Sequence, residues 1–381
     1  MYILFYITAG LLTMYAVLIG YYYNAWKKIP AFGPVNYEGF TGTTRISVIV
    51  PARNEAAHIG KCLISLAHQT YPKELLEIIV VNDHSTDDTE QIVRNFPATN
   101  IRLINLSDHT GGQALNSYKK KALDVAIAAS IGELIVTTDA DCTALPNWIR
   151  CLAAFHHQSK AVFLAAPVKI INSRSVLSIF QSIDFLTLQG ITGASVSAKF
   201  HSMCNGANLA YEKKVFYEVG GFQHIDNIAS GDDMLLMHKI IKKYPQRFFF
   251  VKAEAAIVST EPAVTWKSFL QQRIRWASKA DKYDDKRIFF VLLMIYLLNF
   301  FLLIFLLAGL WQRSWIFFFL VLLASKTIIE YGFVQRVAMF FKQQQLMVYF
   351  PFLQPLHIIY TVVAGWLGKF GTYEWKNRKV K

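Results

Sequence analysis

The sequence of 381 residues predicts a doubly wound α/β sheet with transmembrane helices at both ends of the chain. Three observations predict this fold class. Short β-branched runs alternate with helical segments between residues 46 and 138, which is typical of a parallel sheet. Long apolar runs lie near both termini. Hydrophobic residues make up 54% of the chain, which exceeds the usual share in a soluble domain.

Residues 1–23 predict a membrane anchor, because they carry no charged side chain and are long enough to cross a bilayer. Lys27 and Lys28 follow directly, whereas a cleavable signal peptide carries its positive charge before the apolar run. We therefore expect a retained anchor with its lysine end at the cytoplasm. Residues 24–44, with prolines and glycines at five positions, are expected to form a linker.

Alternating strands and helices are expected to build the sheet. The predicted strands are 46–50, 76–81, 101–105 and 134–138, and the predicted helices are 54–69, 86–95 and 119–129. Ligands of such sheets bind beyond the carboxyl ends of the strands. The loops that follow the strands are therefore the expected position of a site.

Polar side chains follow three of the predicted strands. The first two of these loops hold Pro51, Ala52, Arg53, Asn54 and Glu55, and then Asp83 and Ser85. Asp139 and Asp141 follow the fourth strand, and two carboxylates at this spacing can share one hard divalent cation. Such a cation would bridge the two phosphates of a nucleoside diphosphate. One Asp-rich turn is usually a turn or capping device, but three polar turns on one edge indicate a ligand site.

Two further motifs lie downstream. Asp232 and Asp233 precede an apolar helix, where they either cap the helix or provide a general base, Asp233, for a hydroxyl group. Gln272, Arg275 and Trp276 lie in a run of cations and aromatic residues. A guanidinium can bind a pyrophosphate through two hydrogen bonds, and an indole can stack on a sugar. The alternative for this run is the basic edge of an interfacial helix.

Taken in order, these motifs resemble those of the family 2 glycosyltransferases, which are inverting enzymes of the GT-A fold. The resemblance covers about residues 45–280 and rests on Pro51–Glu55, Asp83–Ser85, Asp139–Asp141, Asp232–Asp233 and Gln272–Trp276. The segment Asn205–Tyr211 also resembles the acceptor-side loop of the family. Two positions depart from the family pattern, because Tyr118 replaces a common glycine before Lys119 and Asp232 replaces a common glutamate.

The resemblance implies metal-dependent transfer of a sugar from a nucleoside-diphosphate sugar, with a UDP sugar expected. The implied donor-binding residues are Pro51, Ala52, Arg53, Asn54, Glu55, Asp83, Ser85, Lys119 and Asp139. Mg²⁺ or Mn²⁺ would be held by Asp139 and Asp141. Asp233, beside Asp232, would deprotonate the acceptor hydroxyl, and one displacement would invert the anomeric carbon. The residues implied to meet the acceptor or the diphosphate are Gly206, Asn208, Gln272, Arg275 and Trp276.

The domain boundaries follow from these features. A cytoplasmic GT-A catalytic domain is expected over residues 45–265, and an interfacial segment with the Q-x-x-R-W motif over residues 266–286. The C-terminal part is expected to hold a membrane region over 287–368, with apolar stretches at about 288–310, 315–334 and 346–368, and a basic tail over 369–381. Three full crossings would place that tail outside, against the positive-inside rule, so one stretch is expected not to cross. The stretch Ser175–Val196 is either an interfacial helix or an ordinary core helix.

Two acceptors are compatible with the sequence. A lipid or lipid-linked acceptor at the cytoplasmic face is favoured, because the ending Trp375–Arg378 resembles that of single-transfer lipid enzymes and few helices are available for a polymer channel. The alternative is a processive synthase of an extracellular polysaccharide, which would use a glycan acceptor. The two differ in their product, which is one discrete glycolipid or a ladder of chain lengths.

Charge and composition bear on partners and on rival classes of protein. A net charge of +13 together with apolar ends indicates membrane lipids as partners and disfavours nucleic acid. The four cysteines have no metal-binding spacing. A transporter is disfavoured because the motif carboxylates lie outside the apolar runs, and a catalytically inactive subunit because all the motif acids are present. We expect a multi-pass protein of a bacterial inner membrane, and the sequence predicts no oligomeric state.

Overall fold

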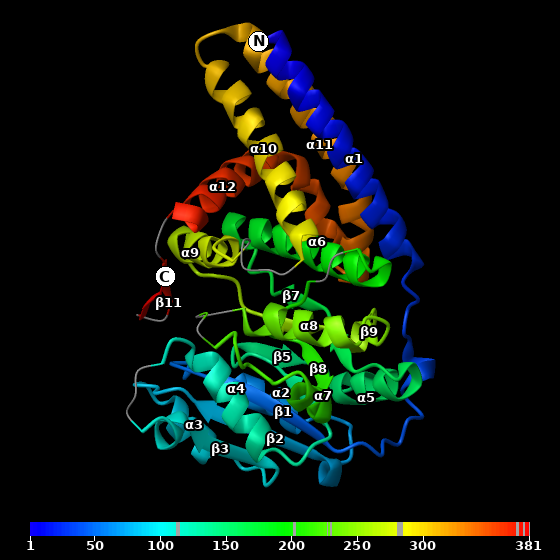
Figure 1. The fold of residues 1–381 in the computed structure, drawn as a ribbon, viewed down its shortest axis with the longest axis vertical. Helices are drawn as coiled ribbons and strands as arrows, with labels where there is room; N and C mark the ends of the chain where they lie inside the picture. Colours follow the sequence, from blue (N-terminus) through cyan, green and yellow to red (C-terminus); the bar gives the residue numbers. More distant parts are fainter. Residues whose placement is uncertain are drawn as a thin grey trace. The chain divides into compact units, whose positions relative to one another are not determined.

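The computed structural model divides into two compact units, which are described separately (Figure 1). The sheet unit comprises Pro30–Lys169 and Ser202–Glu261, and the helical unit comprises Met1–Ile29, Ile170–His201 and Pro262–Lys381. The structure describes the chain apart from residues 112–114, 201–202, 227, 229–230, 280–284, 371–372, 376–377 and 381. Residues 373–375 and 378–380 are described by their backbone alone.

A mixed sheet of seven strands forms the core of the sheet unit, in the order β3-β2-β1-β4-β8-β6-β9. Its strands are β1 (Ile46–Ala52), β2 (Leu76–Asn82), β3 (Ile101–Asn105), β4 (Leu134–Thr137), β6 (Phe163–Ala165), β8 (Leu209–Glu212) and β9 (Phe248–Phe250). β1 pairs in parallel with β2 and β4, whereas β8 runs antiparallel to β4 and β6. Val48, Ile49 and Val50 are fully buried, as expected for a strand covered on both faces. The predicted fold class is confirmed.

Helices and a smaller sheet complete the sheet unit. The α-helices are α2 (Ile59–Ala67), α3 (Thr89–Arg94), α4 (Tyr118–Ala129), α5 (Trp148–Ser159), α7 (Lys213–Glu218) and α8 (Asp232–Lys243). The smaller sheet has the order β5-β10-β7, with β5 (Cys142–Ala144), β10 (Val258–Thr260) and β7 (Val168–Ile170). Single 3-10 turns lie at η1 (Pro34–Asn36), η2 (Lys73–Leu75), η3 (Leu106–His109) and η4 (Glu254–Ala256).

Two helices are shorter than the sequence predicts. α2 begins at Ile59 and not at residue 54, because Asn54 takes a left-handed conformation with a φ of 51° and its amide donates to Ser85 Oγ at 3.0 Å. α3 begins at Thr89 and not at residue 86, because Asp87 accepts a hydrogen bond from the backbone amide of Ala56 at 3.0 Å. The residues that would extend these helices instead join the two strand-end loops.

The helical unit contains the long apolar helices. They are α1 (Tyr2–Lys28), α6 (Val176–Ala198), α10 (Lys286–Ala308), α11 (Arg313–Phe340) and α12 (Phe350–Phe370), and the shorter elements are α9 (Trp266–Ala277), η5 (Gln344–Val348), β11 (Tyr373–Trp375) and β12 (Arg378–Val380). Among the described residues, α1, α10, α11 and α12 are long and apolar enough to cross a membrane. α1 and α11 run in the same direction, since Phe5 packs on Phe318 and Trp26 packs on Phe340. α10 lies alongside both helices (Figure 1).

α6 is a packed helix of the helical unit, and most of its side chains are buried. Its close approach to α11 requires a glycine. A Cβ atom at Gly190 would lie 2.4 Å from Cγ2 of Val337. α6 thus belongs with the apolar helices and not with the sheet, although its sequence lies between two strands of the sheet unit.

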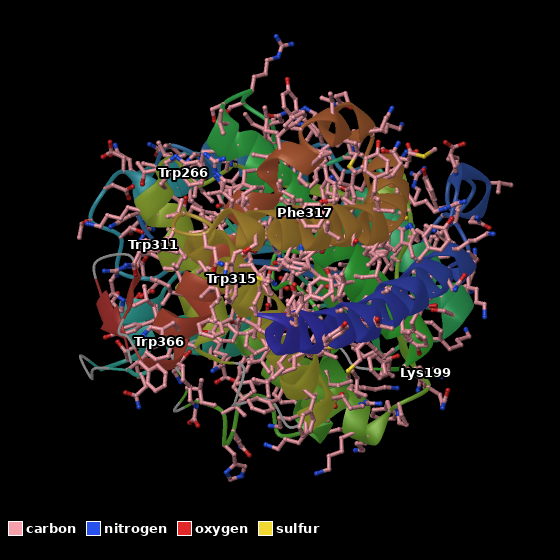
Figure 2. The ribbon with its side chains drawn as sticks, turned by 90° about the horizontal axis from the view of Figure 1, so that it is seen from above. Lys199, Trp266, Trp311, Trp315, Phe317 and Trp366 are labelled. Carbon is pink, nitrogen blue, oxygen red and sulfur yellow. The ribbon has the colours of Figure 1, made fainter. Side chains whose placement is uncertain are left out.

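Exposed aromatic side chains lie at the ends of the apolar helices (Figure 2). Trp311 lies in the α10–α11 connection and is 85% exposed, and Phe317 lies near the start of α11 and is 64% exposed. Trp366, near the end of α12, is 59% exposed. Tryptophan is enriched at membrane–water interfaces because its indole is amphipathic. Their positions are typical of an aromatic belt.

Candidate active site

The loops after β1 and β2 are joined by hydrogen bonds. The strand register places Ala52 opposite Asn82, so both strands end at the same level. Arg53 Nη1 donates to the carbonyl oxygens of Asp83 at 2.8 Å and His84 at 3.2 Å. Asn54 Oδ1 accepts a hydrogen bond from the amide of Thr86 at 2.8 Å. The structure thus brings the Pro51–Glu55 and Asp83–Ser85 motifs together.

The two loops differ in what they expose. Pro51 and Ala52 belong to β1, and Ala52 is buried in the core. The Asp83 carboxylate is also buried, and its Oδ1 lies 2.9 Å from His84 Nδ1 and 3.9 Å from Arg53 Nη1. Glu55 is partly exposed, and its amide donates to Thr89 Oγ1 at 2.8 Å. The partly exposed side chains of Arg53 and Glu55 give this rim polar groups that can bind the polar edge of a nucleoside.

A lysine links the end of β4 to the start of α8. Lys119 Nζ lies 2.7 Å from Asp139 Oδ1 and 3.7 Å from Asp232 Oδ2. Burial would lower the pKa of Lys119, but the carboxylates of Asp139 and Asp232 outweigh burial and raise it above its ordinary value. Lys119 is therefore a fixed positive charge between two motif acids. The adjacent Lys120 donates to the carbonyl oxygens of Ile225 and Ile228 and is 1% exposed.

The acid pair Asp232–Asp233 lies in the first turn of α8. Gly231 caps this helix with a φ of 79°, a conformation that favours glycine. Asp233 Oδ2 accepts a hydrogen bond from the amide of Gly206 at 2.9 Å, and its Oδ1 accepts one from the amide of Met234 at 2.8 Å. The two amides hold both carboxylate oxygens of Asp233 in a fixed orientation. The capping and general-base interpretations of this pair are thus compatible in one geometry.

Gly206 and Asn208 play different parts in the loop before β8. The carbonyl oxygen of Gly206 accepts a hydrogen bond from Thr137 Oγ1 of β4 at 3.0 Å, so this glycine lies between β4 and Asp233. Asn208 is fully buried. Its amide donates to the carbonyl oxygens of Pro167 at 2.8 Å and Ala256 at 2.7 Å and accepts from Trp148 Nε1 at 3.0 Å. Asn208 therefore stabilises the loop through buried hydrogen bonds and is not itself exposed to a ligand.

Asp139 and Asp141 offer hard oxygen donors at the end of β4. Among the described residues, no three His, Cys, Asp or Glu side chains form a metal cluster. Two carboxylates nevertheless fit Mg²⁺ or Mn²⁺, which take their remaining ligands from phosphates and water. Cys142 Sγ lies 3.5 Å from Asp141 Oδ1, and burial together with Asp141 and Asp139 raises the pKa of this thiol. The thiol therefore stays protonated, and the candidate ligands are the carboxylates.

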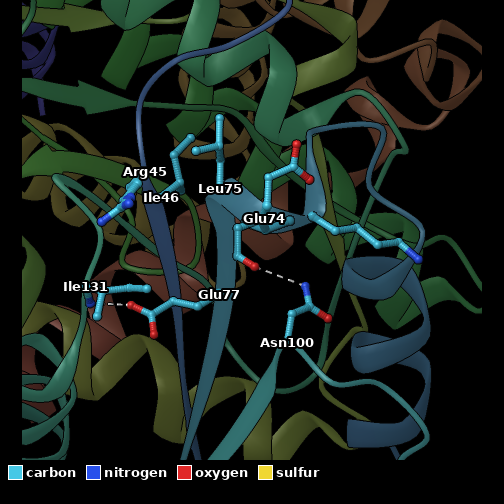
Figure 3. A pocket seen from close by; sticks show the side chains of 9 residues that line it. Arg45, Ile46, Glu74, Leu75, Glu77, Asn100 and Ile131 are labelled. Atoms are coloured by element: carbon cyan, nitrogen blue, oxygen red, sulfur yellow. Dashed lines mark hydrogen bonds between the residues drawn. The ribbon is translucent and has the colours of Figure 1, made fainter.

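A hollow of about 200 Å³ lies at the opposite edge of the sheet, at the amino ends of β1 and β2 (Figure 3). Glu77, which lines it, already accepts hydrogen bonds from the amide of Ile131 and from Ser47 Oγ. Asn100 Nδ2 donates to the carbonyl oxygen of Leu76 at 3.2 Å. Glu77 and Asn100 are thus engaged within the sheet, and ligands of such sheets bind at the other edge.

The three predicted residues of the Q-x-x-R-W motif lie on α9 in the helical unit. Gln272 Oε1 accepts a hydrogen bond from Arg273 Nη1 at 2.9 Å. The Arg273 guanidinium also lies 4.3 Å from the centre of a Trp276 ring. Arg275 is partly exposed, whereas Arg273 is 4% exposed. Arg273 was not predicted as a functional residue, since it occupies a variable position of the motif.

Two family models match overlapping parts of the chain. Residues 134–368 match the model of "Glycosyl transferase family group 2", and residues 47–220 match that of "Glycosyl transferase family 2". Among curated proteins, the probable glycosyltransferase YdaM of Bacillus subtilis is 30% identical over 238 residues, which are 61% of this chain and 54% of that protein. Glycosyltransferase AglE of Haloferax volcanii is 34% identical over 202 residues, which are 50% of this chain and 59% of that protein. The chain thus spans little more than half the length of these relatives.

A solved structure shares the fold. The mannosyltransferase PcManGT of Pyrobaculum calidifontis, in complex with GDP-Man and Mn²⁺, superposes with a TM-score of 0.54 at 20% identity and covers 93% of this chain and 99% of that chain. The match supports the mixed GT-A sheet described above. Because one family model alone spans residues 134–368, well over half of the chain, this protein belongs to glycosyltransferase family 2.

Proposed function

We propose that this enzyme transfers one sugar from a UDP sugar to a hydroxyl group of a lipid or lipid-linked acceptor, with inversion, at the cytoplasmic face of a membrane. The observation that carries the proposal is the position of Lys119 between Asp139 and Asp232. This contact joins the proposed diphosphate end of the site to Asp232, the neighbour of the proposed base Asp233. The residues proposed to act on the leaving group and those proposed to act on the acceptor hydroxyl thus belong to the same unit, the sheet unit.

The donor is proposed to bind across the carboxyl ends of β1, β2 and β4. The linked loops Pro51–Glu55 and Asp83–Ser85 take the nucleoside, and Lys119 takes the diphosphate. Asp139 and Asp141 hold Mg²⁺ or Mn²⁺, which neutralises charge on the diphosphate when bound.

The displacement itself is assigned to Asp233. Its carboxylate accepts the proton of the acceptor hydroxyl while the hydroxyl oxygen forms a bond to the anomeric carbon. The bond from that carbon to the diphosphate breaks on the opposite face, and the diphosphate leaves with the electron pair. The amides of Gly206 and Met234 hold the carboxylate in place, and Gln272 and Trp276 position the acceptor.

The orientation rests on the distribution of charge in the helical unit. Lys27 and Lys28 end α1, and Lys286 and Arg287 begin α10, whereas Arg313 begins α11 at the opposite end of the bundle. The positive-inside rule therefore places the ends that lead into the sheet unit at the cytoplasm. We propose that α12 does not cross, because it contains Pro355 and because its hydropathy, 1.3 over an 18-residue window, is the lowest among the four helices long and apolar enough to cross.

The decisive experiment identifies the product. Membranes containing the full-length enzyme are incubated with Mn²⁺ and a panel of labelled nucleotide sugars that includes UDP-glucose, UDP-N-acetylglucosamine and GDP-mannose. The proposal requires one discrete labelled lipid from a UDP sugar. A ladder of polymer lengths would establish the processive alternative, and labelling from GDP-mannose alone would overturn the choice of nucleotide.

Substitution of the proposed base provides the second test. Asp233→Asn removes proton acceptance, so transfer should fall by about 10²-fold or more. Binding of UDP with Mn²⁺, measured by equilibrium dialysis, should remain near wild type. Asp108→Asn, at an exposed acid of the same unit, serves as the control and should leave transfer unchanged. Near-normal turnover in Asp233→Asn would show that another group is the base.

A further inference from the structure

Arg273 makes a buried ion pair that the reaction scheme above does not use. Its Nε and Nη2 donate to the same oxygen of Asp184, Oδ2, at 3.0 Å and 2.6 Å. Both side chains are 4% exposed. Asp184 lies on α6 and Arg273 on α9, so the pair fixes these two helices of the helical unit to each other.

The same guanidinium contacts two residues of the Q-x-x-R-W motif. Its remaining terminal nitrogen, Nη1, donates to Gln272 Oε1 at 2.9 Å. Its plane lies 4.3 Å from a Trp276 ring and 4.7 Å from the Phe269 ring. One buried side chain thereby limits the rotation of both the Gln272 amide and the Trp276 indole.

Asp184 has a third partner, which brings in α12. Its Oδ1 accepts a short hydrogen bond from the Tyr360 hydroxyl. α12 also approaches the end of α9 closely, because a Cβ atom at Gly368 would lie 2.7 Å from Cβ of Ala277. Asp184, Arg273 and Tyr360, which we name the clamp, therefore connect α6, α9 and α12.

Stability alone is a weak reason for such an arrangement. A buried ion pair costs desolvation energy, and apolar side chains of similar size commonly stabilise a fold as well or better. A guanidinium differs from apolar groups in having several donors at fixed angles. The clamp uses three of these nitrogens, two on Asp184 and one on Gln272, which is the geometry of an orienting device.

We propose that Arg273 is a positioning residue that sets the Gln272 amide and the Trp276 indole for the acceptor, with Asp184 and Tyr360 holding it in place. This inference rests on the proposed function, in which Gln272 and Trp276 meet the acceptor. The proposal predicts that the clamp affects the half-saturating lipid fraction and the ratio of donor hydrolysis to sugar transfer. It assigns no effect on donor binding, because the donor residues belong to the sheet unit.

The test uses the full-length enzyme in lipid nanodiscs, with a total lipid extract of the source membranes as the acceptor probe and the UDP sugar identified above. Arg273→Lys keeps the charge but loses the planar donors, and Asp184→Asn keeps the shape but loses the charge. Transfer and hydrolysis of the donor are measured together over a series of lipid mole fractions. A misplacement of about 1 Å can cost about 10²-fold in rate, so the half-saturating lipid fraction should rise about tenfold or more.

Three further results are expected. The ratio of hydrolysis to transfer rises in both variants, while KM for the UDP sugar stays within about twofold of wild type. The double variant is hardly worse than either single variant, because both remove one shared contact. Tyr360→Phe, the mildest change, shifts the same ratio in the same direction by a smaller factor and guards against a folding defect.

The matched control is Arg336→Lys. Arg336 lies on α11, donates to the Tyr23 hydroxyl at 2.7 Å and lies 5.0 Å from that ring, so it resembles Arg273 in chemistry but touches none of the three motif residues. Its variant should behave as wild type. The positioning role is overturned if Arg273→Lys and Asp184→Asn transfer normally, or if they lose hydrolysis and transfer in equal proportion. A wild-type enzyme that hydrolyses the donor but labels no lipid or glycan instead refutes the proposed function, and the clamp proposal with it.

Discussion

At the scale of single residues, the candidate site is held together by contacts that join motifs far apart in the sequence. Lys119 contacts Asp139 and Asp232, and the amide of Gly206 contacts Asp233. The sequence predicted these residues but could not predict their pairing. Lys119 and Asp139 are 20 positions apart, and Gly206 and Asp233 are 27 positions apart, so no local sequence signal indicates these contacts.

Lys119 gives a prediction with opposite effects on two ligands. In Lys119→Met, UDP with Mn²⁺ should bind about tenfold more weakly, because one charge-assisted hydrogen bond to phosphate is lost. Mn²⁺ alone should bind at least as well as before, since no ammonium then competes for Asp139 Oδ1. Equilibrium dialysis and electron paramagnetic resonance of Mn²⁺ measure the two.

The control is Lys121→Met, a substitution two residues further along α4. This variant should bind both ligands normally. Equal losses of nucleotide in both variants would mean that general charge, and not contact with the diphosphate, sets affinity.

Asp87 makes stability depend on pH. Burial raises its pKa, but the hydrogen bonds from Thr89 and from the amide of Ala56 together outweigh burial and lower the pKa below the ordinary value. A group with a lowered pKa stabilises the fold above its unfolded pKa of about 3.9, and that contribution disappears as pH falls through the folded pKa. The Tm difference between wild type and Asp87→Asn should therefore shrink as pH falls from about 6 to about 3. Asp88→Asn is the control, and its Tm difference from wild type should not show this trend. A Tm difference between wild type and Asp87→Asn that grows toward acid pH would contradict this account.

At the scale of elements, the strands were predictable and the helix starts were not. The strands are short β-branched runs buried on both faces, which a sequence displays directly. α2 and α3 start late because Asn54 and Asp87 bond across to the neighbouring loop, and such contacts depend on a strand pairing that local sequence does not encode. For the same reason the partner of Arg273, which lies 89 residues away, could not be found.

The apolar helices carry a buried polar network that also escaped prediction. On α11, Lys326 Nζ lies 2.7 Å from Glu330 Oε1. Gln354 of α12 accepts from Lys326 at 2.7 Å and donates to Glu330 Oε2 at 2.6 Å. The Tyr15 hydroxyl of α1 donates to Glu330 as well. The network therefore specifies how α1, α11 and α12 meet.

Removing one member of this network should destabilise the helical unit. Lys326→Met leaves Glu330 buried without its cation, which typically costs about 3–5 kcal/mol. Thermal unfolding in detergent should show a clear fall in Tm. The double variant Lys326→Met with Glu330→Gln should regain much of the loss, and Ser325→Ala, at a partly exposed neighbour, should change little. No recovery in the double variant would rule out the unpaired charge as the cause.

At the scale of the whole molecule, orientation in the membrane follows from charge and from the number of crossings. Single cysteines at residues 28, 311 and 381, in a chain whose native cysteines are replaced by serine, report the side of each position. With α12 not crossing, an impermeant maleimide added to intact cells should label position 311 alone. Labelling of position 381 from outside would show that α12 crosses.

The first turn of α4 has a mechanical consequence. Neighbouring residues on a helix point about 100° apart, and here Lys119 reaches Asp139 and Asp232 while Lys120 reaches the loop that leads into α8. The rotation of α4 about its own axis therefore determines whether both lysines meet their partners. A slip of one residue along α4 would present each lysine to the wrong loop. We therefore expect the protein to tolerate an insertion in the loop before α4 better than an insertion within the first turn of α4, which would rotate the two lysines away from their partners.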